Sequence, residues 1–105
     1  MTDDSDLVER VRTALRTVID PEIGLDIVEI GLVYDIAVEE EDVVRISMTT
    51  TTMGCPATSY LRDGAGEAAQ SVAGVHAVDV QLTYDPPWTP DMMSADARNY
   101  LGVGR

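Results

Sequence analysis

The chain has 105 residues, 45% of them hydrophobic, which suits the core of one small domain. Its 19 acidic and 7 basic residues give a formal net charge of -12, which argues against binding to nucleic acids or anionic membranes. No apolar stretch approaches the roughly 18 residues of a membrane span. The acidic N-terminus also lacks the basic and apolar segments of a secretory signal. We therefore expect a single domain over residues 1–105, outside membranes.

All 7 basic residues are arginine, and lysine is absent. An acidic surface of this kind suits high salt, where the repulsion between like charges is screened. We therefore hypothesise a halophilic source. The alternative is that the charge serves only to keep the protein in solution.

The first predicted element is a helix that follows a disordered segment, residues 1–5. Asp6 and Glu9 have the spacing of a capping box at a helix start. Apolar residues then recur at helical spacing as far as Val18. We expect the helix to end before Asp20-Pro21, because the residue before a proline avoids helical backbone angles.

Two strands follow, because apolar residues alternate with polar ones over residues 32–39 and 43–48. The acidic run of residues 39–42 is expected to be a solvated turn, so the two strands should pair antiparallel. The β-branched residues Thr49 to Thr52 are expected to continue the second strand as far as Met53-Gly54.

A second helix is predicted from Cys55-Pro56, since proline suits the first helical position. Gly64 and Gly66 weaken this helix by about 1 kcal/mol each relative to alanine. A third strand is predicted over residues 78–84 and a stiff loop over residues 85–90. Ser94 is placed to cap a last helix that ends near Leu101. The order α-β-β-α-β-α predicts an α+β fold, a three-stranded mixed sheet with helices on one face.

Cys55 is the main candidate for chemistry. As the single cysteine it forms no internal disulfide, which suits a reducing compartment such as the cytoplasm. Gly54 and Pro56 flank it, and a thiol at the N-terminal end of a helix favours the thiolate that binds metals. One cysteine cannot complete an iron–sulfur or zinc site alone, so a site shared between subunits stays open.

Two other interpretations of Cys55 remain. A free cysteine is often an inert core residue. A Cys–His pair would need the only histidine, His76, beside the thiol, and nothing in the sequence requires that.

Two further segments are candidates. Asp20-Pro21-Glu22 either ends the first helix or supplies two carboxylates near Cys55, as oxygen ligands or a proton acceptor. The proline-rich loop around Trp88, with Met92 and Met93, either presents a partner-binding surface or caps the core. A core role is favoured for at least one of the two methionines.

Four segments together resemble the family that includes the SufT-type iron–sulfur assembly factors and the PaaD subunit of phenylacetate degradation. They cover nearly the whole chain, about residues 7–102, and are Asp20-Pro21-Glu22, Gly31-Leu32-Val33-Tyr34, Gly54-Cys55-Pro56 and the closing run Asp85 to Ser94. The closing run looks more like the SufT-type branch.

This resemblance implies a fold similar to cluster-scaffold domains and a role in maturing iron–sulfur proteins, with Cys55 as the key residue and Asp20 and Glu22 as the acidic motif. It implies assembly machinery and client apoproteins as partners, and transient binding of iron or a cluster rather than a stable cofactor. We expect a non-enzymatic factor, and a homodimer is one arrangement that would bring two Cys55 thiolates together. The alternatives are a PaaD-like subunit of an oxygenase complex and an adaptor that binds clients through the Trp88 loop.

Overall fold

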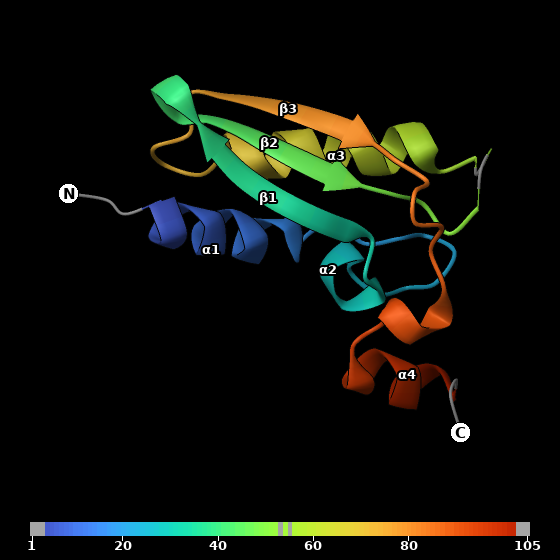
Figure 1. The fold of residues 1–105 in the computed structure, drawn as a ribbon. Helices are drawn as coiled ribbons and strands as arrows, with labels where there is room; N and C mark the ends of the chain where they lie inside the picture. The colour runs from blue at the N-terminus through green and yellow to red at the C-terminus, as the bar shows by residue number, and fades with distance from the viewer. Residues whose placement is uncertain (1–3, 53, 55, 103–105) are drawn as a thin grey trace.

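In a computed structural model, residues 4–52, 54 and 56–102 are described, and they form four α-helices, two short 3₁₀ helices and one three-stranded sheet (Figure 1). Within these residues, no helix has the length and apolar character needed to cross a membrane.

Helix α1 spans Asp4–Leu15. Its start is earlier than predicted, so Asp4 and Ser5 are helical rather than disordered. Asp6 does not cap the helix, because it lies inside the first turns and pairs with Arg10 at 3.0 Å. Its end is also earlier than predicted. The Thr17 hydroxyl donates to the Ala14 carbonyl at 2.7 Å, a local bond that competes with further helix.

The sheet is mixed, as predicted. Strands β1 (Val33–Glu39) and β2 (Val43–Met48) pair antiparallel, and β3 (Ala77–Leu82) pairs with β2 in parallel. The short helix η1 (Glu40–Asp42) forms the exposed turn between β1 and β2. The α+β prediction is confirmed.

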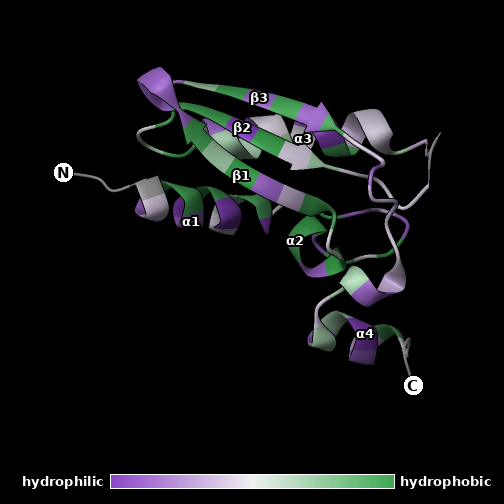
Figure 2. Cartoon of the chain, viewed as in Figure 1, coloured by the Kyte–Doolittle hydropathy of each residue, from purple (hydrophilic) through white to green (hydrophobic). Residues whose placement is uncertain are grey.

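One face of this sheet carries the core. Val44, Ile46 and Met48 of β2 are fully buried, whereas Ser47 lies between Asp35 and Gln81 on the other face. Figure 2 shows the resulting bands of hydrophobic and polar residues along the strands. Helices α1 and α3 (Thr58–Gln70) contact each other and cover the apolar face.

Two predicted boundaries near the cysteine are wrong. Strand β2 ends at Met48, and Thr49 and Thr50 follow in a loop. Their hydroxyls donate to the backbone carbonyls of Thr50 and Thr52, and such local bonds compete with further strand pairing. Helix α3 begins at Thr58 instead of Pro56, because Ala57 adopts non-helical angles and accepts the first helical hydrogen bond, from Leu61.

The C-terminal segment lies beyond one end of the sheet (Figure 1). It contains η2 (Pro90–Met92) and α4 (Ala95–Leu101), and α4 is capped by Ser94 and ended by Gly102 as predicted. The short helix α2 (Ile27–Ile30), which the sequence did not predict, is the main neighbour of α4. The last helix therefore does not lie on the sheet face with the other two.

Candidate functional site

The segment that carries the predicted site leaves the sheet where the parallel strands β2 and β3 end together. Met48 pairs with Leu82 as the last pair, and the Met48 carbonyl accepts a hydrogen bond from the Thr83 backbone N–H at 2.9 Å. The Thr49 backbone N–H then donates to the Leu32 carbonyl at 2.8 Å. The chain is thus held from both sides before it continues toward Gly54 and Pro56.

A chain of hydroxyl groups fixes the next residues. Thr50 is 1% exposed, and its hydroxyl donates to the Thr52 carbonyl at 2.7 Å and lies 2.8 Å from the Tyr84 hydroxyl. The single hydroxyl proton of Thr50 is already donated, so Tyr84 is the donor in the second bond. Tyr84 therefore anchors the approach to Gly54. Sequence reasoning placed the threonines and Tyr84 in strands and missed this role.

Cys55 and Met53 lie outside the described residues, so the position of the Cys55 thiol stays a prediction. Its neighbours Gly54 and Pro56 are exposed, and Gly54 has a φ of 75°, which favours glycine. His76 lies at the opposite end of the sheet, where its backbone N–H donates to the Asp42 carbonyl. The described residues thus give no support to a Cys–His pair.

Asp20 has a local structural role. It is 3% exposed, and its Oδ1 accepts hydrogen bonds from the backbone N–H groups of Glu22 (2.8 Å) and Ile23 (3.3 Å). The carboxylate therefore closes the tight turn that follows Asp20. The Glu22 side chain is exposed. Ligation by Asp20 or Glu22 stays a prediction. Within the described ranges, no group of three or more His, Cys, Asp or Glu side chains is arranged to hold a metal ion.

The Trp88 loop is docked onto the protein. The indole N–H of Trp88 donates to the Ile30 carbonyl at 2.9 Å, and the half-buried ring packs against the core. Met93 is 7% exposed, and the sulfur of half-buried Met92 lies 3.4 Å from the Tyr34 hydroxyl. Met93 is therefore a core residue, as expected for at least one of the two methionines, and the partner-binding role of the loop stays a prediction.

The structure shows why position 31, before Leu-Val-Tyr, is a glycine. Its φ of 87° ends α2 in the left-handed region, and a Cβ placed there would lie 2.7 Å from the Met92 carbonyl carbon. The backbone of the Trp88 loop therefore rests directly on Gly31. Tyr34 adds a second contact, because its hydroxyl lies 2.9 Å from the Pro86 carbonyl oxygen.

Glu29 joins three distant segments. It accepts a hydrogen bond from the Ser94 hydroxyl and forms an ion pair with Arg16 at 2.7 Å. These two bonds, the one from Ser94 first, lower the pKa of the Glu29 carboxyl below its ordinary value of 4.5. The Ser94 backbone N–H also donates to the Glu29 carbonyl at 2.8 Å. The start of α4 is thus fixed to α2.

Comparisons with known proteins bear on the family and the fold of this chain. Residues 8–82 match the family model described as "Iron-sulfur cluster assembly protein". The Fe-S protein maturation auxiliary factor SufT of Staphylococcus aureus is 43% identical over 82% of this chain and 98% of its own length. A putative component of the 1,2-phenylacetyl-CoA epoxidase of Escherichia coli is 40% identical over 90% of this chain, but over only 56% of its own length.

A crystal structure from Bacillus anthracis, described as a domain of unknown function, superimposes on this chain with a TM-score of 0.90. It is 33% identical, and 96% of each chain is covered. The fold and the resemblance expected from the four motifs are therefore confirmed. The chain belongs to the iron–sulfur cluster assembly protein family.

Proposed function

We propose that this protein is a non-enzymatic maturation factor for iron–sulfur proteins, in which the Cys55 thiolate transiently binds iron or a cluster as cargo. The observation that carries the proposal is the match to a maturation auxiliary factor over 98% of that relative's length. The matched region is nearly the whole of that relative. The function of such a factor would therefore reside in a fold of this size.

The small number of possible metal ligands in the chain supports a role in transfer, and not the permanent binding of a cluster. The chain has one cysteine and one histidine, whereas a cluster is usually held by four ligands. A client apoprotein or a second copy would have to supply the others. Transfer is then a ligand exchange in which a client thiolate replaces Cys55 on iron. The iron keeps its oxidation state, and the departing Cys55 thiolate regains a proton.

The described residues on both sides of the cysteine are held in place by contacts with the rest of the protein. The Thr50–Tyr84 bond holds the end of the segment that leaves β2, and α3 begins three residues after Cys55. Both ends of the short connection are therefore attached to the core. Such attachment would keep the thiol in a limited region while the client approaches.

The test compares three proteins: wild type, Cys55→Ser, and a double variant Cys55→Ser with Ser59→Cys. The double variant keeps one thiol but moves it to an exposed position of α3. Each protein is given ferrous iron and sulfide and then an apo-[4Fe–4S] dehydratase, whose recovered activity is measured. We expect recovery only with wild type, while circular dichroism shows the same fold for all three. Full recovery with Cys55→Ser would refute the proposal.

The adaptor alternative makes the opposite prediction for the Trp88 loop. Under that alternative, Trp88→Phe would reduce client maturation more than Cys55→Ser does. The indole N–H of Trp88 is engaged by Ile30, so the described contacts give this side chain an internal role. We therefore expect Trp88→Phe to lower stability and to leave cargo transfer largely intact.

A further inference from the structure

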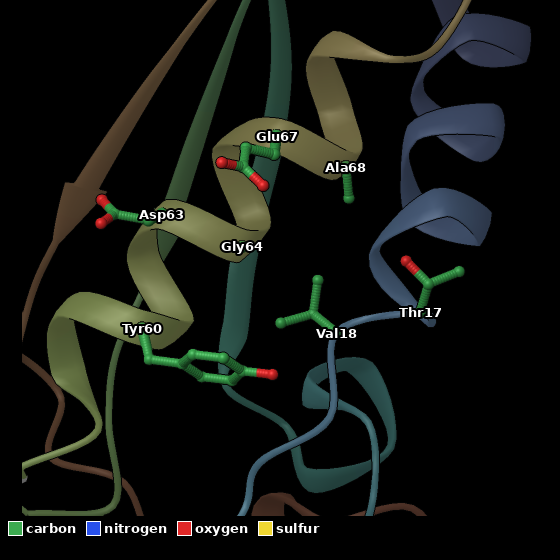
Figure 3. Close-up of a pocket in the computed structure, with 7 residues that line it drawn as sticks. All are labelled: Thr17, Val18, Tyr60, Asp63, Gly64, Glu67 and Ala68. Atoms are coloured by element: carbon green, nitrogen blue, oxygen red, sulfur yellow. The ribbon is translucent and has the colours of Figure 1, made fainter.

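A groove between α1 and α3 has no part in the cargo chemistry. It has a volume of about 510 Å³ and is lined by two residues of the segment that follows α1 and five residues of α3, which are Thr17, Val18, Tyr60, Asp63, Gly64, Glu67 and Ala68. Figure 3 shows Val18 facing α3, with Ala68 above it, Thr17 to its right and the Tyr60 ring below it to the left.

The floor of the groove is apolar and its wall is aromatic. Gly64 lets α3 lie close to Val18, since a Cβ on Gly64 would approach the Val18 side chain to 3.2 Å. Tyr60 is 60% exposed, so most of its aromatic ring is available for contact with a partner. An apolar floor beside an exposed tyrosine is typical of a surface that binds another protein.

The charge on the groove is entirely acidic. Asp63 and Glu67 lie one helical turn apart on the same side of α3, and no cationic residue lines the groove. Asp63 faces Arg62 only at 3.9 Å, with both side chains largely exposed, so that ion pair contributes little. In the described part of the chain, the Glu67 carboxylate takes part in none of the ion pairs. A neighbouring hollow toward β3 is also lined by Asp63 and Glu67, but it contains Arg62 as well.

We propose that this groove binds a segment of a partner protein in which arginine or lysine alternates with an apolar residue. The apolar side chain would pack on Val18 and Ala68, and the cation would pair with Asp63 and Glu67 while its stem lies against Tyr60. A second copy of this chain is a poor occupant, because it brings 19 acidic residues against 7 basic ones. The net charge of -12 would also speed the approach of a basic partner.

The groove lies beside the segment that carries Cys55. Tyr60 is in the first turn of α3, two residues after Thr58, where the helix begins. A partner held in the groove would therefore be close to the connection between β2 and α3. Binding itself does not depend on the thiol, so this proposal goes beyond the proposed function and survives its failure.

The test uses a fluorescein-labelled peptide of alternating arginine and leucine, with a glutamate-for-arginine peptide as the control ligand. Binding is measured by anisotropy at about 150 mM salt, where surface charges are screened beyond roughly 8 Å. The double variant Asp63→Asn with Glu67→Gln should weaken binding about tenfold. The matched double variant Glu40→Gln with Glu41→Gln removes the same charge from the exposed η1 turn and should change binding less than about twofold.

Two substitutions that leave the net charge unchanged test the contribution of the shape of the groove. Ala68→Leu fills the groove and Tyr60→Ala removes its exposed wall, and both should weaken binding about tenfold without altering net charge. Amide chemical shifts should change at Thr17, Tyr60 and Glu67 in the Cys55→Ser protein as well as in wild type. Equal effects of the two charge variants would overturn the proposal, since they indicate only general attraction. Unchanged binding by both Ala68→Leu and Tyr60→Ala would also overturn it.

Discussion

The layer of helices on the sheet and the C-terminal segment are attached by different kinds of contact. Helices α1 and α3 lie on the sheet through fully buried apolar side chains, among them Val11, Leu61 and Ile46. The segment from Pro86 to α4 buries fewer apolar side chains, Met93 and Ala97, and is also attached by single polar or backbone contacts made to Gly31, Ile30 and Glu29.

This difference predicts how each region responds to small changes. Apolar burial is shared by many atoms and depends little on direction, so one added methyl group can be accommodated at a position of the helix layer where the neighbouring atoms are at ordinary contact distance. A backbone contact such as that between Gly31 and Met92 depends on one atom pair. The same methyl group there should be costly, and the predictions below use this contrast.

The largest effect is expected for Gly31→Ala. The new Cβ would meet the Met92 carbonyl carbon at 2.7 Å, and alanine disfavours a φ of 87°. We expect a loss of about 3 kcal/mol or more in the free energy of unfolding, from left-handed strain and steric overlap together. Urea denaturation measures this loss, and faster amide exchange in α4 would show that the C-terminal segment detaches.

Gly24→Ala is the matched control, because Gly24 has a φ of 83° and no atom within 4 Å of its Cβ position. It should show only the backbone strain, about 1–2 kcal/mol. Equal losses for the two variants would contradict the claim that the Met92 backbone rests on Gly31.

The next effect concerns pH and Glu29. Its carboxyl has a lowered pKa when folded, so the ionised form stabilises the protein above pH 4.5, and this contribution is lost as pH falls through the lower folded pKa. Glu29→Gln should therefore cost about 1–2 kcal/mol at neutral pH and progressively less in acid. Denaturation of both proteins between about pH 7 and pH 3 measures the difference. A gap that does not narrow below pH 4.5 would contradict this prediction.

Tyr84→Phe tests the anchor next to the cysteine segment. It removes the hydroxyl that donates to buried Thr50, and a lost hydrogen bond of this kind costs about 1 kcal/mol. Tyr60→Phe is the control for stability, since the Tyr60 side chain is 60% exposed and its change should be near zero. Hydrogen exchange at the amides of Thr50 and Thr52 should increase only in Tyr84→Phe.

The elements that sequence reasoning found are those with local signals. Alternation gave all three strands, and Ser94 with Gly102 gave α4, because capping residues act within one turn. Helix α2 was missed because four residues are too few to show a helical period. The start of α3 was placed two residues early because proline suits several positions near a helix start.

The candidate site was predictable only in part, for a different reason. Gly54, Cys55 and Pro56 stand out as a motif, but Tyr84 and Thr50 are 34 residues apart and no pattern links them. The bond between Glu29 and Ser94 spans 65 residues. Asp20 drew attention as a carboxylate, yet its observed contacts are with the backbone of its own turn.

The smallest effect, and the opposite sign, is expected for Gly66→Ala in α3. The new Cβ would lie 3.7 Å from the nearest atom, in the Val80 side chain, which is ordinary van der Waals contact. Alanine should therefore raise the free energy of unfolding by about 0.5–1 kcal/mol through its helix propensity. In Gly64→Ala, contact with Val18 at 3.2 Å should reduce or cancel that gain. If Gly66→Ala instead destabilised the protein as Gly31→Ala does, the helix layer would depend on individual atom contacts as the C-terminal segment does, and the contrast between the two regions would fail.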